Sequence, residues 1–220
     1  MTSPFAAALF DLDGTLLDTE ALCNATGVLA CAALGVPVEP AFFEALAGID
    51  DAERVRRISA HAGRPLDPGA FLAEWDRLTL GRMEAGVPLK PGARDLVALL
   101  RDRGLPLALV TSSRRGPAWA KLRGAGLAGA FARVVTVEDV ARPKPAPDPY
   151  LFAAAALGVQ AAACVVFEDS DPGALSAARA GCTVVQVPDR EGQTGASATL
   201  VAPDLLAGAA LAGLVTRSRA

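Results

Sequence analysis

The sequence predicts an α/β fold, namely a doubly wound parallel sheet with an all-helical insertion after its first strand. Short apolar runs of β-forming residues alternate with helical patterns along most of the chain, as expected for a parallel sheet whose two faces are covered by helices. Prolines near the first turn and glycines after the last turn punctuate the helices. Between residues 17 and 88, by contrast, helical periodicity occurs without a convincing strand.

Five apolar runs are the expected strands, and four helical patterns lie between them. Because each run is continuous rather than alternating, we expect the strands to be buried on both faces. The expected strands are residues 5–10, 105–110, 133–135, 163–167 and 183–187, and the expected helices are residues 92–103, 117–125, 147–157 and 172–180. The alanine- and leucine-rich tail 200–214 is interpreted as a surface helix that packs on the core, and 190–199 as a plain loop.

The insertion is expected to form a second domain. All of its segments have helical patterns, and the chain enters and leaves it through two expected hinges, residues 17–19 and 88–91. We therefore assign residues 1–16 and 89–220 to an α/β core domain and residues 17–88 to a helical domain. A chain of 220 residues is long enough for a core domain with such an insertion.

Composition excludes several classes of partner. The net charge is −3 and 52% of the residues are hydrophobic, which predicts a packed globule without the basic stripe that nucleic acid requires. The N-terminal stretch lacks the features of a secretory signal, and no apolar run reaches the roughly 20 residues of a membrane span. The four cysteines lack C-x-x-C spacing and are interpreted as buried free thiols. We expect a cytoplasmic monomer with no nucleic-acid or membrane partner.

Polar clusters follow the expected strands at the points where they end. Asp11, Asp13, Gly14 and Thr15 follow the first strand, and "TSS" (111–113) follows the second. The third is followed by a short acidic link and then "RPKPAPDPY", which contains Lys144, and the fourth by "EDS" (168–170). In a parallel α/β sheet ligands bind beyond the carboxyl ends of the strands, so we expect these clusters to meet at one edge.

Two aspartates separated by one residue on a strand project to the same side. With Asp169 from another strand, Asp11 and Asp13 would form a set of hard oxygen ligands suited to Mg²⁺, which would offset the repulsion between them. Lys144 would add a positive charge, and the hydroxyls of Thr111 and Ser112 could donate hydrogen bonds to a phosphate. The site is therefore predicted to hold a cation and a small phosphate ester.

The same pair of carboxylates permits two chemical roles. One can attack phosphorus to give an aspartyl phosphate, and the other can protonate the leaving oxygen and later activate water. The only histidine, His61, lies in the helical insertion, so carboxylates must carry out the proton transfers.

The four motifs resemble those of the haloacid dehalogenase superfamily, and the resemblance extends over essentially the whole chain. They are "DLDGTLLDTE", "VTSS", "RPKPAPDPY" and "VVFEDSDPGALSAARAG", in the family order. The resemblance implies a Rossmann-like core, Asp11 as nucleophile and Asp13 as general acid/base. It further implies phosphoryl binding by Thr111 and Lys144, and a mobile cap formed by the insertion. Mg²⁺ would be held by Asp11, the backbone carbonyl of Asp13, Asp169 and, in an assisting role, Glu168.

Departures from the family patterns favour a phosphatase. The dehalogenating branch lacks a carboxylate at the position of Asp13, and the phosphonoacetaldehyde-hydrolysing branch needs a cap lysine, whereas residues 17–88 contain none. The sequence resembles the β-phosphoglucomutase/phosphoglycolate phosphatase-like subfamily, but Cys23 and Asp51 stand where the mutase cap has a histidine and an arginine. We therefore expect a Mg²⁺-dependent phosphatase of small phosphorylated metabolites, with sugar phosphates as the preferred class.

Two alternatives stay open. A β-phosphoglucomutase-like phosphotransferase would use the same motifs, and Arg114 could bind its distal phosphate. A phospho-accepting signalling module also combines an acidic pocket with a hydroxyl residue and a lysine, although such modules are about half this length and lack a helical cap. Possible substrate contacts outside the catalytic set are Thr15, Glu20, Gly48 and Arg114.

Overall fold

The computed structural model describes residues 3–46, 49 and 51–215, except the side chain of Glu84. The chain divides into two compact units, an α/β unit of residues 1–18 and 88–220 and a helical unit of residues 19–87. The two connecting segments pair with each other inside the α/β unit. Leu17 forms an antiparallel bridge with Leu89, and the Asp18 amide donates to the Pro88 carbonyl at 2.9 Å.

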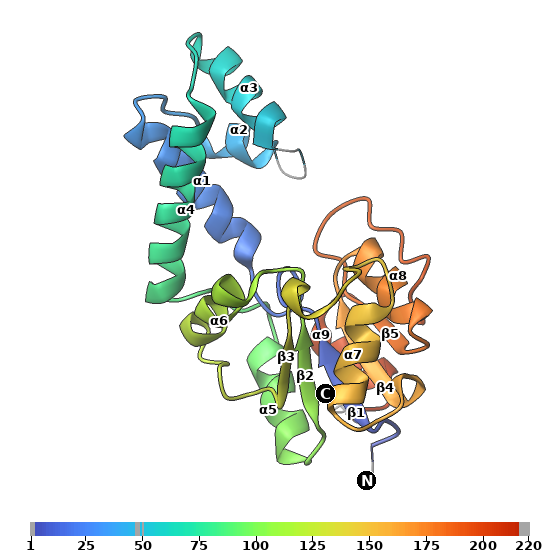
Figure 1. The fold of residues 1–220 in the computed structure, drawn as a ribbon. Helices are drawn as coiled ribbons and strands as arrows, with labels where there is room; N and C mark the ends of the chain where they lie inside the picture. The colour runs from blue at the N-terminus through green and yellow to red at the C-terminus, as the bar shows by residue number, and fades with distance from the viewer. Residues whose placement is uncertain (1–2, 47–48, 50, 216–220) are drawn as a thin grey trace, which may run out of the picture. The chain divides into compact units, whose positions relative to one another are not determined.

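Within the described residues, the α/β unit contains one parallel sheet of six strands in the order β3-β2-β1-β4-β5-β6. Figure 1 labels the strands β1 to β5. The chain builds outward from β1 first on one side and then on the other, which is the doubly wound topology that the sequence predicts. The strands are β1 (Ala7–Phe10), β2 (Leu107–Val110), β3 (Arg133–Val135), β4 (Cys164–Glu168), β5 (Thr183–Gln186) and β6 (Leu200–Val201).

Strand bounds differ from the expected ones where backbone chemistry intervenes. Strand β2 begins at Leu107 rather than at residue 105, because Pro106 has no N–H to donate to the ladder. The tail 200–214 is not one helix, and this prediction was wrong in part. Its first two residues form the edge strand β6, and the helix α9 (Leu205–Leu211) begins only after Pro203, where the Asp204 carboxylate caps it by accepting from the Ala207 amide at 2.8 Å.

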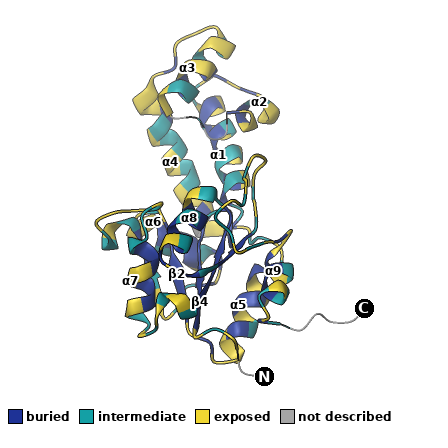
Figure 2. Ribbon diagram, turned by 90° about the vertical axis from the view of Figure 1, so that its right-hand side faces the viewer, coloured by how far each residue is buried: buried dark blue, intermediate teal, exposed yellow. Residues whose placement is uncertain are grey.

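Helices cover both faces of the sheet. Alternate residues of the strands, such as Leu9 and Val166, share a buried cluster with residues of α7 (Asp148–Ala156) and α8 (Asp171–Arg179). On the opposite face, α9 approaches Val185 of β5 and lies on the same side as α5 (Figure 2). The helices of this unit are α5 (Ala93–Asp102), α6 (Arg115–Gly124), α7 (Asp148–Ala156), α8 (Asp171–Arg179) and α9, with short 3₁₀ turns η1 (Val137–Asp139) and η2 (Ala161–Ala163) that the sequence did not predict.

Burial on both faces explains the continuous apolar strands. Every residue of β1, β2 and β4 is buried, and Figure 2 shows β2 and β4 in the colour of buried residues. The edge strands β3 and β6 contain exposed residues. Three of the cysteines are buried as expected, whereas Cys23 is half-buried, and all four are free. Burial raises the pKa of Cys31 and Cys164 to about 11 and that of Cys182 to about 12. Within the described residues, no helix combines the length and apolarity that crossing a membrane would require.

The helical unit has a core of its own. Phe43, Phe71 and Trp75 pack in one aromatic cluster, with ring centroids of Phe43 and Trp75 5.5 Å apart in an edge-to-face arrangement. The indole N–H of Trp75 donates to the Cys23 carbonyl at 2.9 Å and so ties α4 to α1. The helices are α1 (Thr19–Ala33), α2 (Pro40–Glu44), α3 (Asp51–Ala62) and α4 (Pro68–Ala85). Exposed His61 stacks on Phe42 with ring centroids 3.9 Å apart.

Alanine substitutions at two glycines, Gly27 and Gly81, test how tightly this core is packed. A Cβ at Gly27 of α1 would lie 2.0 Å from Cζ of the buried Phe43 ring, whereas a Cβ at Gly81 of α4 would meet nothing within 4 Å. We expect Gly81→Ala to stabilise the helical unit by about 0.5–1 kcal/mol. We expect Gly27→Ala to destabilise it by about 1–3 kcal/mol, because overpacking outweighs the same helix-propensity gain.

Urea unfolding followed by Trp75 fluorescence in a Trp119→Phe background measures both changes in the helical unit. Equal stabilisation by the two substitutions would contradict the tight contact between Gly27 and Phe43.

Candidate active site

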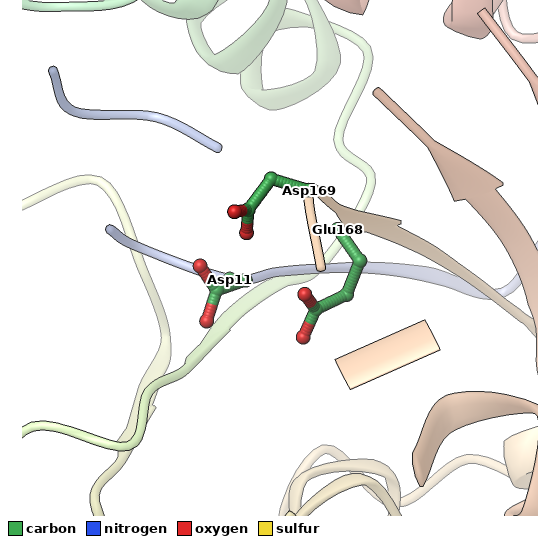
Figure 3. Close-up of side chains that lie close together, drawn as sticks. All are labelled: Asp11, Glu168 and Asp169. Carbon is green, nitrogen blue, oxygen red and sulfur yellow. The ribbon is translucent and has the colours of Figure 1, made fainter. Parts of the chain in front are cut away.

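Three acidic side chains meet where two neighbouring strands end. Asp11 directly follows β1, Glu168 is the last residue of β4, and Asp169 follows it. The Asp11 amide donates to the Phe167 carbonyl at 3.0 Å, so β1 and β4 stay in register at their carboxyl ends. One oxygen from each carboxylate lies within 4.8 Å of the others, and Figure 3 shows the three side chains side by side. Since the strand order reverses between β1 and β4, this is the position where such sheets bind ligands.

Asp11 is buried, and only one of its two carboxylate oxygens has a hydrogen-bond partner among the described residues. Its Oδ1 accepts from the Lys144 ammonium at 2.7 Å, whereas its Oδ2 has no hydrogen-bond partner among the described residues. Burial raises the pKa of Asp11 well above its usual range, which Lys144 opposes, and the charges of Glu168 and Asp169 raise it further. A divalent cation would supply the partner that Oδ2 lacks, and hard carboxylate oxygens fit Mg²⁺.

Asp169 completes the acidic cluster. Burial, and next the charge of Glu168, raise the pKa of Asp169 to about 7. The buried hydroxyl of Thr15 donates to its Oδ1 at 3.2 Å. A Cβ at Gly14, whose φ is 88°, would lie 2.5 Å from Asp169 Oδ2, so this turn requires glycine for both its conformation and its space.

Lys144 is a fixed cation inside the site. Its side chain is 7% exposed, and its ammonium donates to Asp11, to Glu168 at 2.6 Å and to the Val110 carbonyl at 2.9 Å. Burial by itself lowers the pKa of Lys144, but the charges of Asp11 and Glu168 outweigh it and raise that pKa above its usual value. Lys144 therefore stays protonated beside the Asp11 carboxylate.

Glu168 orients this cation. It is fully buried, and its Oε1 accepts from both Lys144 and the Tyr150 hydroxyl, the latter at 2.6 Å. Its Oε2 accepts from the Ser170 hydroxyl at 3.2 Å. A Cβ at Gly173 would lie 2.0 Å from Glu168 Oε1, so the first turn of α8 leaves room for the carboxylate only because this residue is glycine.

Asp13 has separate partners. Its Oδ1 accepts from the Lys121 ammonium at 2.6 Å, and its Oδ2 accepts from the Ser113 hydroxyl at 2.9 Å. The side chain of Lys121 is 10% exposed and that of Asp13 is 32% exposed. The two aspartates of the first motif therefore contact two different lysines.

The clusters from all four motifs line one cavity of about 380 Å³. Its lining residues are Asp11, Asp13, Thr111, Ser112, Ser113, Lys144, Asp169, Ser170, Arg190 and Gln193. A larger cavity of about 740 Å³ opens at the other end of the sheet, near Phe5 and Pro106, but no carboxylate lines it. The smaller cavity is therefore the candidate active site.

Residues 190–199 form a loop, as expected, and two of its residues, Arg190 and Gln193, line this cavity. The Asp171 carboxylate accepts from the amides of Thr194 and Gly195, at 2.9 and 3.1 Å, and from the Gln186 side chain at 2.9 Å. These hydrogen bonds lower the pKa of Asp171 to about 2, and the hydrogen bond from Gln186 has the largest effect. Gln193 in turn accepts from the Asp171 amide at 2.8 Å.

The other residues predicted from sequence have different placements. Thr111 is buried and its hydroxyl accepts from the Ser113 amide at 3.0 Å, while Ser112 is exposed. Arg114 is exposed and lies outside the cavity lining. Glu20 lies in α1 of the helical unit, so its approach to substrate stays a prediction. Gly48 lies outside the described residues.

Sequence reasoning missed four residues of the site: Lys121, Tyr150, Arg190 and Gln193. The chain has only three lysines, and Tyr150 is its single tyrosine, at the end of the third motif. This scarcity was the available signal for the first two. For Arg190 and Gln193, in a polar loop, no signal was available before the contacts of Asp171 were known.

Comparisons with known proteins agree with this geometry. A family model described as haloacid dehalogenase-like hydrolase matches residues 5–181. The hexitol phosphatase A of Escherichia coli (strain K12) is 36% identical over 183 residues, covering 81% of this chain and 81% of the relative. The fructose-1-phosphate phosphatase YqaB of the same organism is 33% identical over 187 residues, covering 85% of this chain and 98% of the relative.

Solved structures give the same result. A HAD family hydrolase from Deinococcus radiodurans R1 with bound phosphate and sodium matches with a TM-score of 0.78 and 31% identity, covering 99% of this chain and all of the other. The family model spans most of the chain, both relatives match most of their own length, and the motif residues converge on one cavity. The chain therefore belongs to the haloacid dehalogenase-like hydrolases.

Proposed function

We propose that this hydrolase is a Mg²⁺-dependent phosphatase of small phosphorylated metabolites, with sugar and polyol phosphates as its substrates. The position of the Asp11 carboxylate carries the proposal. It contacts a fixed cation, Lys144, and one of its oxygens lies within 4.8 Å of an oxygen of Glu168 and of Asp169. The Asp11 Oδ2 is buried without a hydrogen-bond partner among the described residues. The names of the two relatives, a hexitol phosphatase and a fructose-1-phosphate phosphatase, support the substrate class.

Two displacements at phosphorus make up the reaction. The Asp11 carboxylate attacks phosphorus and the ester P–O bond breaks, while Asp13 gives its proton to the departing alkoxide. Asp13, now a carboxylate, takes a proton from water as that water attacks the aspartyl phosphate. Inorganic phosphate leaves, and Asp11 and the protonated Asp13 are regenerated.

The remaining residues bind and balance charge. Lys144 would neutralise one phosphoryl oxygen, and the hydroxyls of Thr111 and Ser112 can donate to the others. Asp11, the backbone carbonyl of Asp13, Glu168 and Asp169 would hold Mg²⁺. When bound, Mg²⁺ would withdraw charge from the phosphoryl oxygens and offset their repulsion from Asp11.

The nucleophile is the first test. We expect Asp11→Asn to lower kcat for phosphate release from sugar and polyol phosphates by on the order of 10³-fold or more, because the amide cannot form the acyl phosphate. Released inorganic phosphate, measured with Mg²⁺ over a substrate panel, gives the rates. Asp102→Asn, at the exposed end of α5, is the matched control and should retain wild-type activity.

The same assay separates the alternatives. A mutase would convert β-glucose 1-phosphate to its 6-phosphate isomer without net phosphate release, and a signalling module would retain the acyl phosphate without turnover. Either result, or full activity of Asp11→Asn, would contradict the phosphatase.

Metal binding should depend on pH through Asp169. The pKa of Asp169, about 7 without a bound cation, exceeds that of an aspartate in the unfolded chain. The folded state therefore disfavours the charged carboxylate, and the free energy of unfolding decreases as the pH rises toward 7. A cation bound to Asp169 would favour the charged carboxylate instead. We expect Mg²⁺ to raise Tm, with a half-saturating concentration that decreases from pH 5.5 to 7.5 because protons compete for Asp169. At 100 times Kd, Mg²⁺ would stabilise by about 2.7 kcal/mol.

Thermal unfolding with and without Mg²⁺ measures the effect. Asp169→Asn should lose most of the Tm increase, and Asp102→Asn should keep it. An equal increase in both variants would place the cation elsewhere and contradict the proposed ligands.

Gly173 tests the role of Glu168. We expect Gly173→Ala to lower activity by on the order of 10²-fold, because the new Cβ displaces the carboxylate that orients Lys144, and small misplacements in an active site are costly. Gly129→Ala, where a Cβ meets nothing within 4 Å, is the control. Phosphate release at saturating substrate measures both, and a fully active Gly173→Ala would exclude an orienting role for Glu168.

A further inference from the structure

Lys121 is a buried cation that the reaction described above does not use. It lies in α6, on the turn that also buries Ala118 and Leu122, and its ammonium contacts the Asp13 carboxylate at 2.6 Å and the Ser113 hydroxyl at 3.0 Å. Ser113 also donates to the other oxygen of Asp13. The three side chains thus form a closed triangle that engages both carboxylate oxygens.

We propose that Lys121 is a positioning residue that fixes the Asp13 carboxyl group at the wall of the active-site cavity, where it exchanges protons with the leaving oxygen. The inference rests on the proposed function, since it assigns Lys121 a role in the phosphatase reaction. Ser113 acts with Lys121 as the second contact. Each carboxyl oxygen has two lone pairs, so one contact per oxygen leaves room for the transferred proton.

The cost of burying an ammonium group supports a specific role. A lysine moved out of water is destabilising unless it is paired and hydrogen-bonded, and an apolar side chain would fill the same place in α6 without that cost. The pairing with Asp13 and Ser113 is what compensates for the burial of Lys121. The ion pair therefore serves Asp13 rather than the packing of α6.

The surroundings of Asp13 show why it needs such a contact. Asp13 is two residues from Asp11 and borders the same cavity as Asp169. Without an opposing cation, its carboxylate could turn toward a metal bound by Asp11 and Asp169 and become another ligand. Among the described residues, the two lysines pair with different acidic groups. Lys144 forms ion pairs with Asp11 and Glu168, and Lys121 forms an ion pair with Asp13. This division keeps the proton-transfer group apart from the cation ligands.

The choice of leaving group distinguishes a positioning role of Lys121 from a merely structural one. The value of kcat/KM reports the steps up to departure of the leaving group, so later hydrolysis of the aspartyl phosphate does not affect it. A p-nitrophenolate ion departs without a proton, whereas the alkoxide of a sugar or polyol phosphate needs one. Loss of positioning at Asp13 should therefore affect only the second substrate type.

The experiment compares Lys121→Met, Lys121→Arg and the control Arg123→Met, which removes a charge from an exposed position of the same helix. The substrates are p-nitrophenyl phosphate and the sugar or polyol phosphate that the wild-type enzyme hydrolyses fastest, both with saturating Mg²⁺. For Lys121→Met we expect kcat/KM on the alkyl ester to fall by on the order of 10²-fold, the scale of general acid catalysis, and kcat/KM on p-nitrophenyl phosphate to change by less than about threefold. Lys121→Arg should restore most of the loss, and Arg123→Met should match the wild type.

Each other outcome overturns the inference. Equal losses on both substrates would mean a structural role for Lys121, and unchanged or faster hydrolysis of the alkyl ester would mean that the contact holds Asp13 in an unproductive position. Retained p-nitrophenyl phosphatase activity also verifies that Lys121→Met is folded. A wild-type protein inactive on both substrates would instead overturn the proposed function itself, which separates the two failures.

Discussion

Electrostatic balance at the carboxyl edge of the sheet is the constraint on which the site depends. Asp11, Glu168 and Asp169 lie within reach of one cation, and their mutual repulsion in a buried setting would be prohibitive without opposite charges. Lys144 offsets one charge of the three, and the two that remain when all are ionised equal the charge of a divalent ion. In the metal-free state the raised pKa values of Asp11 and Asp169 express the same imbalance.

The lysines of the chain are concentrated at this edge. Lys144 pairs with Asp11 and Glu168, Lys121 pairs with Asp13, and Lys90 pairs with Asp189, which lies near Gly14. The sequence holds three lysines against eighteen arginines, and each of the three forms an ion pair with an acidic side chain in or near the motifs at this edge. At Lys144, a compact ammonium fits between the carboxylates of Asp11 and Glu168, where the broad guanidinium fork would need more room.

The residues that line the cavity at this edge all belong to the α/β unit. Strands β1 and β4 are neighbours, so their following residues meet, and the close approaches at Gly14 and Gly173 make room for the carboxylates. The insertion leaves and rejoins the α/β unit through segments that pair with each other, and its aromatic core is separate.

The sequence by itself determined the helices and strands of the sheet and the polar residues that meet at its carboxyl edge. Continuous apolar runs predicted five of the six described strands to within two residues. The polar clusters that follow those strands in the sequence predicted that Asp11, Lys144 and Asp169 meet at one edge, and all three line the same cavity. The two-residue strand β6 was missed, since so short a run carries no periodic signal. Only the tertiary structure decided the partners: Lys121 is 108 residues from Asp13, and Tyr150 is 18 residues from Glu168. Helical periodicity assigns Lys121 to α6 and the chain order assigns 190–199 to a loop, but hydrogen bonds between distant segments depend on how helices pack on the sheet, which no local pattern encodes.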